Sequence, residues 1–200
     1  SGTPANADVG SIDVKVMATD GSAASASDTF ALNVTNTNGA PIVANAIADQ
    51  TIAEDSALSF KFASDVFADV DVGDSLTYTA ALSNDAALPS WLSFDASTRT
   101  FSGTPANADV GSIDVKVTAT DGSAASASDT FAIAVTNTND APTVANAIGD
   151  QTIAEYSALS FQFASNVFAD VDVGDSLTYT AVLSNDAALP SWLSFDASTR

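Results

Sequence analysis

The stretch Ile113-Asp114-Val115-Lys116-Val117-Thr118-Ala119 alternates apolar residues with Asp, Lys and Thr at every step. Successive side chains of an extended chain point to opposite faces, so this alternation predicts a strand with one buried face. The same period of two recurs in 58–62, 76–82 and 131–135. No stretch carries a sustained helical period of 3.6 residues with caps. The chain is therefore predicted to be all-β.

Turn-forming residues separate these predicted strands. They lie at Gly73-Asp74, Asn84-Asp85, Asp121-Gly122 and in the stretch Ser-Gly-Thr-Pro at 102–105. Gly, Asn, Asp and Pro favour tight turns because of their special backbone geometry or local hydrogen bonds. Short strands at this regular spacing, about six or seven in each repeat, are typical of a β-sandwich.

The chain repeats itself at a spacing of 101 residues, and 89 of the 99 residue pairs that can be compared are identical. A period of this length matches one whole domain. The stretches 35–41 and 136–142 each follow a predicted strand and end in Pro, which cannot donate a hydrogen bond to a neighbouring strand. We therefore expect the second half of a unit at 1–38, a complete unit at 39–139 and the first half of a following unit at 140–200.

Composition excludes several classes of function. The formal net charge is −20, from 25 acidic residues against 5 basic ones, so the surface repels nucleic acid and attracts cations. The sequence has no Cys and no His, which excludes disulfides, zinc sites of the usual kind and Cys- or His-based catalysis. The many Ser and Thr residues lack a general base to activate them, so no enzyme activity is expected.

Four motifs of the repeat, in this order, resemble a known family. They are Asn-Thr-Asn-Asp-Ala-Pro at the boundary, Asp-x-Asp-x-Gly-Asp-Ser-Leu-Thr-Tyr, Leu-Pro-Ser-Trp-Leu-Ser-Phe-Asp, and Ala-Thr-Asp-Gly. Together they resemble the dystroglycan-type cadherin-like domains found in tandem in large bacterial surface and secreted proteins. The resemblance implies a Greek-key β-sandwich of the cadherin and immunoglobulin type, with Ca²⁺ bound where successive domains meet.

The residues themselves also favour Ca²⁺, which takes six to eight oxygen ligands from carboxylates, amides and carbonyls. Asp69 and Asp71 alternate on an extended segment, so both carboxylates point to one side. Asp121 ends a predicted strand. Glutamate occurs only as Glu54 and its equivalent Glu155, and a long carboxylate suits a shared calcium site.

By analogy with cadherins, the resemblance assigns candidate ligands to two junctions. The upper junction, between 1–38 and the central unit, joins Asn6, Asp8, Asn36, Asn38, Asp69, Asp71 and Asp121. The lower junction, between the central unit and 140–200, joins Glu54, Asn107, Asp109, Asn137, Asn139, Asp140, Asp170 and Asp172. The sequence departs from cadherins in carrying Asn in the linkers, Gly39 in place of an acid, and no consecutive acidic motif near Asp109.

Other acidic and aromatic residues are expected to have purely structural roles. Scattered acids such as Asp13, Asp28, Asp85 and Asp186 are expected to form a solvated acidic coat. Asp74 is predicted to be a turn residue, because it follows Gly73 and can bond its own backbone. Asp95 is predicted to do the same in its own turn. Trp91 and Trp192 are predicted to pack into the core, since each lies in an apolar segment after a Pro.

Two functions remain open at this stage. One is a calcium-binding structural or adhesive repeat, a stalk or cohesive segment of a large secreted or cell-surface bacterial adhesin. The other is a module that recognises polysaccharide or a partner cell, because related repeats occur in polysaccharide-degrading proteins. The near-identity of the repeats favours the stalk, since a recognition site needs only one or a few copies.

The two outer segments carry complementary halves of one unit. Each half alone leaves strand edges unpaired and apolar surface uncovered, which favours pairing with another chain. We therefore expect 140–200 of one molecule to pair with 1–38 of another, giving a homo-oligomer of adjacent identical repeats. Such pairing adds Asp20 and Glu155 as the ligands that the two junctions otherwise lack.

Overall fold

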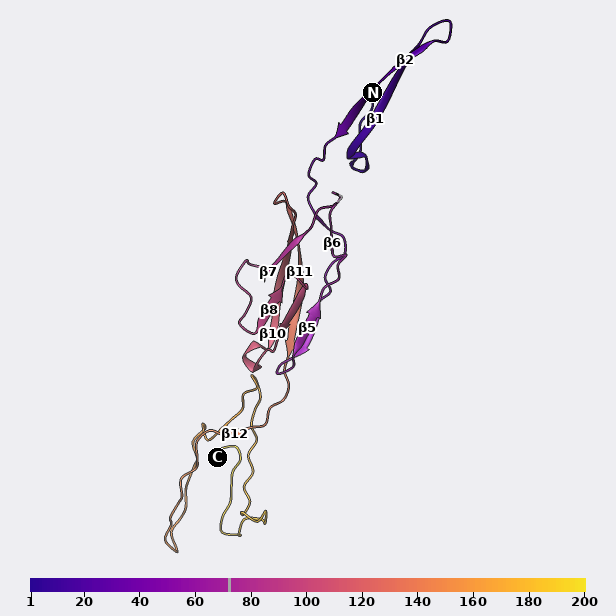
Figure 1. Cartoon of the computed structure of the whole chain (residues 1–200). Helices are drawn as coiled ribbons and strands as arrows, with labels where there is room; N and C mark the ends of the chain where they lie inside the picture. The colour runs from indigo at the N-terminus through magenta and orange to yellow at the C-terminus, as the bar shows by residue number, and fades with distance from the viewer. Residues whose placement is uncertain (72) are drawn as a thin grey trace.

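A computed structural model describes residues 1–71 and 73–200, so Val72 of the Asp-x-Asp-x-Gly-Asp motif lies outside the described residues. The molecule is elongated, with the first hairpin at one end, a sandwich in the middle and residues 140–200 at the other end (Figure 1). The predicted all-β class is confirmed. The two 3₁₀ turns, η1 (Asn6–Asp8) and η2 (Asn107–Asp109), are the helical elements of the described chain.

The central unit is a sandwich of a four-stranded and a three-stranded sheet. The first sheet has the order β4 (Gln50–Ala53), β11 (Ser126–Thr136), β10 (Gly111–Thr120), β7 (Thr77–Leu82). The second has the order β5 (Leu58–Lys61), β9 (Thr100–Gly103), β8 (Leu92–Asp95). A short antiparallel ribbon of β3 (Ile42–Val43) and β6 (Phe67–Ala68) lies beside them. All pairings are antiparallel except that of β4 with β11.

Alternating side chains of the two sheets form one core. Val115, Val117 and Ile133 are fully buried, as the alternation at 113–119 and 131–135 predicts. Phe101 of β9 reaches the opposite sheet, where its ring centroid lies 5.5 Å from that of Phe131 in an edge-to-face arrangement. Burying one such side chain contributes about 1.5–3 kcal/mol, so this layer dominates the stability of the central unit.

Gly103 shows how closely β8 and β9 approach. A Cβ at this position would lie 1.7 Å from the carbonyl oxygen of Trp91, a backbone atom that cannot move aside freely. The position therefore requires glycine.

The outer segments contain fewer strands among the described residues. β1 (Gly10–Thr19) and β2 (Ser25–Val34) form a hairpin with the same register as β10 and β11, offset by 101 residues. The segment 140–200 contains one short ribbon, β12 (Thr143–Val144) with β13 (Phe168–Ala169), among the residues that the structure describes. No helix in the described chain is long and apolar enough to cross a membrane.

Candidate metal centres at the two junctions

The upper junction brings together residues that are far apart in the sequence. Asn38, in the linker after β2, donates its side-chain N–H to Oδ2 of Asp121 at 3.0 Å. The next linker residue, Gly39, donates its main-chain N–H to Oδ2 of Asp71 at 2.7 Å. Asn6 of η1 also donates its side-chain N–H to the carbonyl oxygen of Val70. The linker and η1 of the first segment therefore contact the loop after β6 and the end of β10.

Three carboxylates of the central unit gather at this junction. One oxygen each from Asp69, Asp74 and Asp121 lie within 4.8 Å of one another. Loss of hydration raises the pKa of Asp74, and the negative charges of Asp69, Asp71 and Asp121 raise it further. The protein thus concentrates negative charge at one place, which a bound cation would offset.

Asp121 is held in its ionised form. The hydrogen bond from the Asn38 side chain is the largest of the effects that lower the pKa of Asp121, and main-chain N–H groups of 123–125 add to it. Its Oδ1 accepts hydrogen bonds from the main chain of Ser123 and Ala125, at 2.8 and 2.9 Å. The loop after β10 thus fixes the position of this carboxylate, which is 6% exposed.

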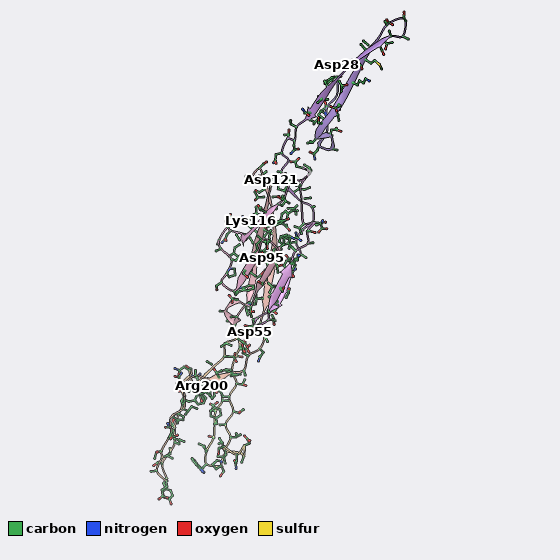
Figure 2. The ribbon with its side chains drawn as sticks, in the orientation of Figure 1. Asp28, Asp55, Asp95, Lys116, Asp121 and Arg200 are labelled. Carbon is green, nitrogen blue, oxygen red and sulfur yellow. The ribbon has the colours of Figure 1, made fainter. Side chains whose placement is uncertain are left out.

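Several carboxylate oxygens at the junctions are buried without a partner. Asp69 and Asp71 each use one oxygen to accept a main-chain N–H, from Asp71 and Gly39 respectively. Their other oxygens, Oδ2 of Asp69 and Oδ1 of Asp71, are buried and have no hydrogen bond from any described residue. A buried oxygen of this kind is costly unless a donor or a cation satisfies it. Figure 2 marks this end of the central unit by Asp121.

The lower junction repeats part of this arrangement. Asp140 donates its main-chain N–H to Oδ2 of Asp172 at 2.8 Å, as Gly39 does to Asp71. Asn107 of η2 donates its side-chain N–H to Oδ1 of Asp172 at 3.1 Å. Asp172 is 5% exposed, and one oxygen each of Asp170, Asp172 and Asp175 lie within 4.8 Å of one another.

Glu54 is a buried acid beside the linker, at the lower end of the central unit. It follows β4, and its side chain is 1% exposed. Its Oε1 accepts the main-chain N–H of Thr138 in the linker at 2.7 Å, whereas Oε2 is buried without a partner among the described residues. Glu54 is therefore a buried carboxylate with one oxygen that has no described partner. Such a group is costly by itself, and a bound cation would offset that cost.

The remaining candidates lie at the edges of these clusters or away from them. Asp8 and Asp109 use Oδ2 to accept the main-chain N–H of Ala5 and Ala106, so each closes its own 3₁₀ turn. The linker residues Asn36, Asn137 and Asn139 are exposed. Asn139 donates its side-chain N–H to the carbonyl oxygen of Asp140 at 2.9 Å.

Asp20 and Glu155 join neither acidic cluster. Asp20 follows β1 and its Oδ1 accepts the main-chain N–H groups of Ser22 and Ala24, each at 2.9 Å. Asp20 thus makes the same two main-chain hydrogen bonds as its repeat equivalent Asp121 but lies in no acidic cluster of the described residues. Glu155 is exposed within 140–200, whereas its equivalent Glu54 is buried.

Sequence reasoning missed Asp74 and Asp175 as cluster members. The predicted turn role is present, since Asp74 donates its main-chain N–H to the carbonyl of Asp71 at 3.2 Å, and Asp175 does the same to Asp172 at 3.3 Å. The turn also brings the third carboxylate of the Asp-x-Asp-x-Gly-Asp motif back toward the first. Gly73 and Gly174 adopt φ of 99° and 100°, which other residues rarely do. The glycine of the Asp-x-Asp-x-Gly-Asp motif was therefore the feature of the sequence that indicated this turn.

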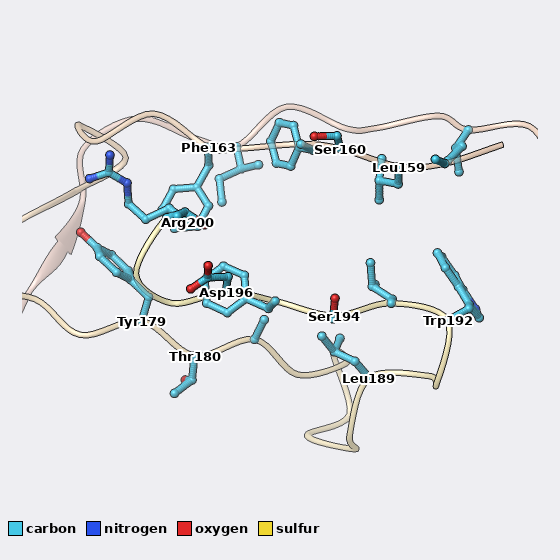
Figure 3. Close-up of a pocket in the computed structure, with 18 of the residues that line it drawn as sticks. Leu159, Ser160, Phe163, Tyr179, Thr180, Leu189, Trp192, Ser194, Asp196 and Arg200 are labelled. Atoms are coloured by element: carbon cyan, nitrogen blue, oxygen red, sulfur yellow. The ribbon is translucent and has the colours of Figure 1, made fainter.

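The prediction of core packing is confirmed for Trp91 and wrong for Trp192. Trp91 is partly buried and packs against the central core. Trp192 is 70% exposed. β9, β10 and β11 complete the core beside Trp91. No described strand covers the corresponding side of 140–200 beside Trp192 (Figure 3).

Comparisons with known proteins agree with this architecture. The family model described as Putative Ig domain matches residues 1–35, 40–136 and 141–200. No curated protein matches the chain. Among solved structures, a protocadherin gammaB7 EC3-6 cis-dimer is 23% identical with a TM-score of 0.53, covering 84% of this chain and 45% of that one. Mouse cadherin-23 EC22-24 is 15% identical with a TM-score of 0.50, covering 69% and 45%.

A polysaccharide-degrading enzyme is also similar in part. The endo-fucoidan hydrolase MfFcnA4 of glycoside hydrolase family 107 is 24% identical over 68% of this chain, with a TM-score of 0.39. The chain spans 20% of that enzyme's length and less than half of the cadherin fragments.

Proposed function

Because the chain belongs to the Putative Ig domain family, we propose that it is a structural repeat of a bacterial extracellular adhesin, with Ca²⁺ bound at its junctions. In this proposal the ion links the end of one sandwich to the start of the next and holds the two in line. The repeated units then act as a stalk or cohesive segment, and the ligand of the adhesin lies elsewhere.

The observation that supports this proposal most directly is the set of buried carboxylate oxygens without hydrogen-bond partners. Oε2 of Glu54, Oδ2 of Asp69 and Oδ1 of Asp71 are all of this kind among the described residues. A scattered acidic coat would instead be exposed and hydrated. The donors are oxygen atoms only, which is the ligand type that Ca²⁺ prefers. The residues present therefore fit this ion.

The same residues indicate how the ion would be held. Asp69, Asp71, Asp74 and Asp121 would supply oxygens at the upper junction. Glu54, Asp170, Asp172 and Asp175 would do so at the lower one. The linker hydrogen bonds to Asp71 and Asp172 position these carboxylates before the ion arrives.

The role of the ion follows from charge. Each junction gathers at least three carboxylates within 4.8 Å, inside a chain of net charge −20. Without a cation this repulsion opposes close contact between the units, whereas a divalent ion offsets it and adds bonds to both sides. Binding to the folded state alone raises the free energy of unfolding as the ion concentration exceeds Kd.

Thermal unfolding and small-angle scattering test the proposal. We expect the melting temperature of the 200-residue chain to rise, and its maximum dimension to become better defined, on going from chelator to millimolar Ca²⁺. Mg²⁺ at the same concentration is the control, because it requires a tighter octahedral site and should stabilise less. Identical melting curves and scattering profiles in chelator and Ca²⁺ would overturn the proposal.

One observation favours the second candidate, a polysaccharide-binding module. Trp192 is 70% exposed and Tyr156 is fully exposed, and exposed aromatic rings can stack on sugars. The equivalent of Trp192 in the complete unit, however, packs against the core. A glycan array probed with the 200-residue chain separates the two functions: retention of specific glycans supports the module, and no retention supports the stalk.

A further inference from the structure

We propose that Asn38 is a site of spontaneous deamidation, a modification that converts the amide of the linker at the upper junction into a carboxylate. The main-chain nitrogen of Gly39 attacks Cγ of Asn38, and water opens the resulting five-membered ring to Asp or isoaspartate. The modification rests on the chemistry and geometry of the linker. Only its effect on cation binding rests on the proposed function.

The sequence singles out this position. Asn38-Gly39 is the only Asn-Gly pair among the 200 residues. Ring closure requires the main-chain nitrogen of the next residue to approach the side-chain carbonyl carbon of Asn. A Cβ on that next residue hinders the approach, and glycine has none. Every other Asn of the chain is followed by a residue with a Cβ.

The structure leaves the pair accessible. Residues 35–41, all of which the structure describes, form an irregular linker between β2 and β3, and the Asn38 side chain is exposed. The rotation of the main chain that closes the ring therefore breaks no strand pairing of these residues. Water also reaches the side chain, as the second step requires.

Hydrogen bonds hold the Asn38 side chain beside the peptide group of Gly39. Its Nδ2 donates to the carbonyl oxygen of Gly39 and to Oδ2 of Asp121, each at 3.0 Å. The main-chain N–H of Gly39 donates to Oδ2 of Asp71 at 2.7 Å. A charged acceptor at this distance polarises the N–H bond and makes the nitrogen more nucleophilic. The linker thus holds the two reacting groups close together.

The reaction balances with water as its one co-reactant. A bond forms between the Gly39 nitrogen and Cγ of Asn38, and the bond from Cγ to Nδ2 breaks. The proton of the Gly39 nitrogen passes to water, and Nδ2 leaves as ammonia with a proton taken from water. A water molecule then opens the ring. Cleavage of the new bond to Cγ gives Asp, and cleavage of the original peptide bond gives isoaspartate.

The lower junction has the same local geometry without glycine. Asn139 donates its Nδ2 to the carbonyl oxygen of Asp140 at 2.9 Å, and the main-chain N–H of Asp140 donates to Oδ2 of Asp172 at 2.8 Å. Asn139 is also exposed in an irregular linker. Asp140 carries the Cβ that hinders ring closure. The molecule therefore contains its own comparison, with a reactive Asn38 and an unreactive Asn139.

Deamidation changes the charge of the upper junction. The Asn38 amide donates a hydrogen bond to Asp121, and a carboxylate in its place cannot donate one. A further negative charge then lies beside the cluster of Asp69, Asp74 and Asp121. Without a cation this charge adds repulsion, whereas Ca²⁺ gains another oxygen ligand. The modified junction therefore depends more strongly on the cation than the unmodified one.

Mass spectrometry tests the modification in the folded 200-residue chain. After incubation at mildly alkaline pH, fragmentation of the digested peptides locates each gain in mass from amide to acid. We expect Asn38 to deamidate at least about tenfold faster than Asn139. Isomerisation at Asp20-Gly21 or Asp121-Gly122 leaves the mass unchanged and does not interfere. Equal rates at the two Asn residues, or reaction of Asn38 in denaturant alone, would overturn the proposal.

Exchanging the residue after each Asn tests the cause. The Asp140→Gly variant should make Asn139 react as fast as Asn38, and Gly39→Asp should slow Asn38 at least about tenfold. A Cβ at position 39 would lie 2.7 Å from Cγ2 of Val70, a side chain that is 57% exposed and can turn away. Thermal melting of both variants checks folding. An Asn139 that stays unreactive in Asp140→Gly would overturn the role of glycine.

The effect on the cation is tested with an Asn38→Asp chain, which contains the Asp product. It should melt at a lower temperature than the wild type in chelator and bind Ca²⁺ at least about tenfold more tightly. The control Asn33→Asp adds the same charge at an exposed position of β2 and should do neither. Equal calcium affinities of the two variants would overturn this effect and leave the deamidation standing. A wild type that binds no Ca²⁺ would overturn the proposed function instead.

Discussion

The main-chain N–H of Thr138 donates to Oε1 of Glu54 across 2.7 Å, although the two residues are 84 positions apart in the chain. The parallel pairing of β4 with β11 brings them together, and the main-chain N–H of Glu54 returns a bond of 3.0 Å to the carbonyl of Thr136. The linker is thereby tied to the end of β4 in the unit that it leaves. Oε2 of Glu54 stays buried without a described partner, available to a cation.

A Glu54→Gln substitution should separate the effect of this buried charge on stability from its effect on calcium binding. Gln keeps the size of the side chain and an oxygen that accepts the Thr138 N–H, but removes a buried charge. We expect the variant to be as stable as the wild type or more stable in chelator, and to bind Ca²⁺ about tenfold more weakly, or about 1.4 kcal/mol. Chemical unfolding with and without Ca²⁺ measures both effects.

The matched control is Asp55→Asn, which removes the neighbouring but exposed charge. It should change neither the stability in chelator nor the calcium affinity appreciably. If the two variants respond alike to Ca²⁺, Glu54 is not a ligand.

Replacing Gly103 by Ala should destabilise the central unit. The new Cβ would lie 1.7 Å from the carbonyl oxygen of Trp91, so β8 and β9 must move apart beside the core residue Leu92. Overpacking of this kind costs about 1–3 kcal/mol or more. Urea unfolding measures the loss. Gly122→Ala is the control, since no atom lies within 4 Å of its Cβ position, and a loss equal to that of Gly103→Ala would refute the steric explanation.

The Asp95 carboxylate should contribute to stability only above acidic pH. The Ser97 hydroxyl is the largest of the effects that lower the pKa of Asp95, and hydrogen bonds from Thr98 and the Ser97 main chain add to it. Because the folded value lies below the unfolded one, about 3.9, this stability is fully present above the unfolded value and is lost as pH falls through the folded value.

Nuclear magnetic resonance titration measures this pKa directly. The Ser97→Ala variant should shift it back toward the ordinary value, and Asp95→Asn should unfold with a shallower dependence on pH below about 4. Asp196, whose pKa the Ser198 hydroxyl lowers in the same way, is an internal repeat of the test. An Asp95 pKa that is unchanged by Ser97→Ala would show that the hydroxyl has no such role.

Much of the central sandwich could be predicted because its strands alternate over long stretches. The predicted strands at 113–119 and 131–135 lie within β10 and β11, and those at 58–62 and 76–82 correspond closely to β5 and β7. The parallel pairing of β4 with β11 could not be derived in this way, since alternation specifies a face and not a neighbour.

The candidate sites show a similar division. Local spacing predicts that Asp69 and Asp71 share a side. The residues also point to Asp121, which ends a predicted strand, and to Glu54, one of two glutamates in the chain. The sequence predicts only a turn role for Asp74. Its approach to Asp69 follows from the turn at Gly73, whereas its approach to Asp121 depends on where β10 ends. The exposure of Trp192 depends on which strands cover it, and an apolar segment by itself does not specify those strands.

Calorimetric titration with Ca²⁺ tests the central claim most directly, using two double variants that each remove two negative charges. Asp71→Asn with Asp172→Asn alters both junctions, while Asp13→Asn with Asp114→Asn alters exposed positions on β1 and β10. We predict that the wild type and the second variant bind Ca²⁺ with Kd of about 10⁻⁵ to 10⁻³ M, and that the first binds at least about tenfold more weakly. Indistinguishable titrations of the two variants, or no binding by the wild type, would contradict the account.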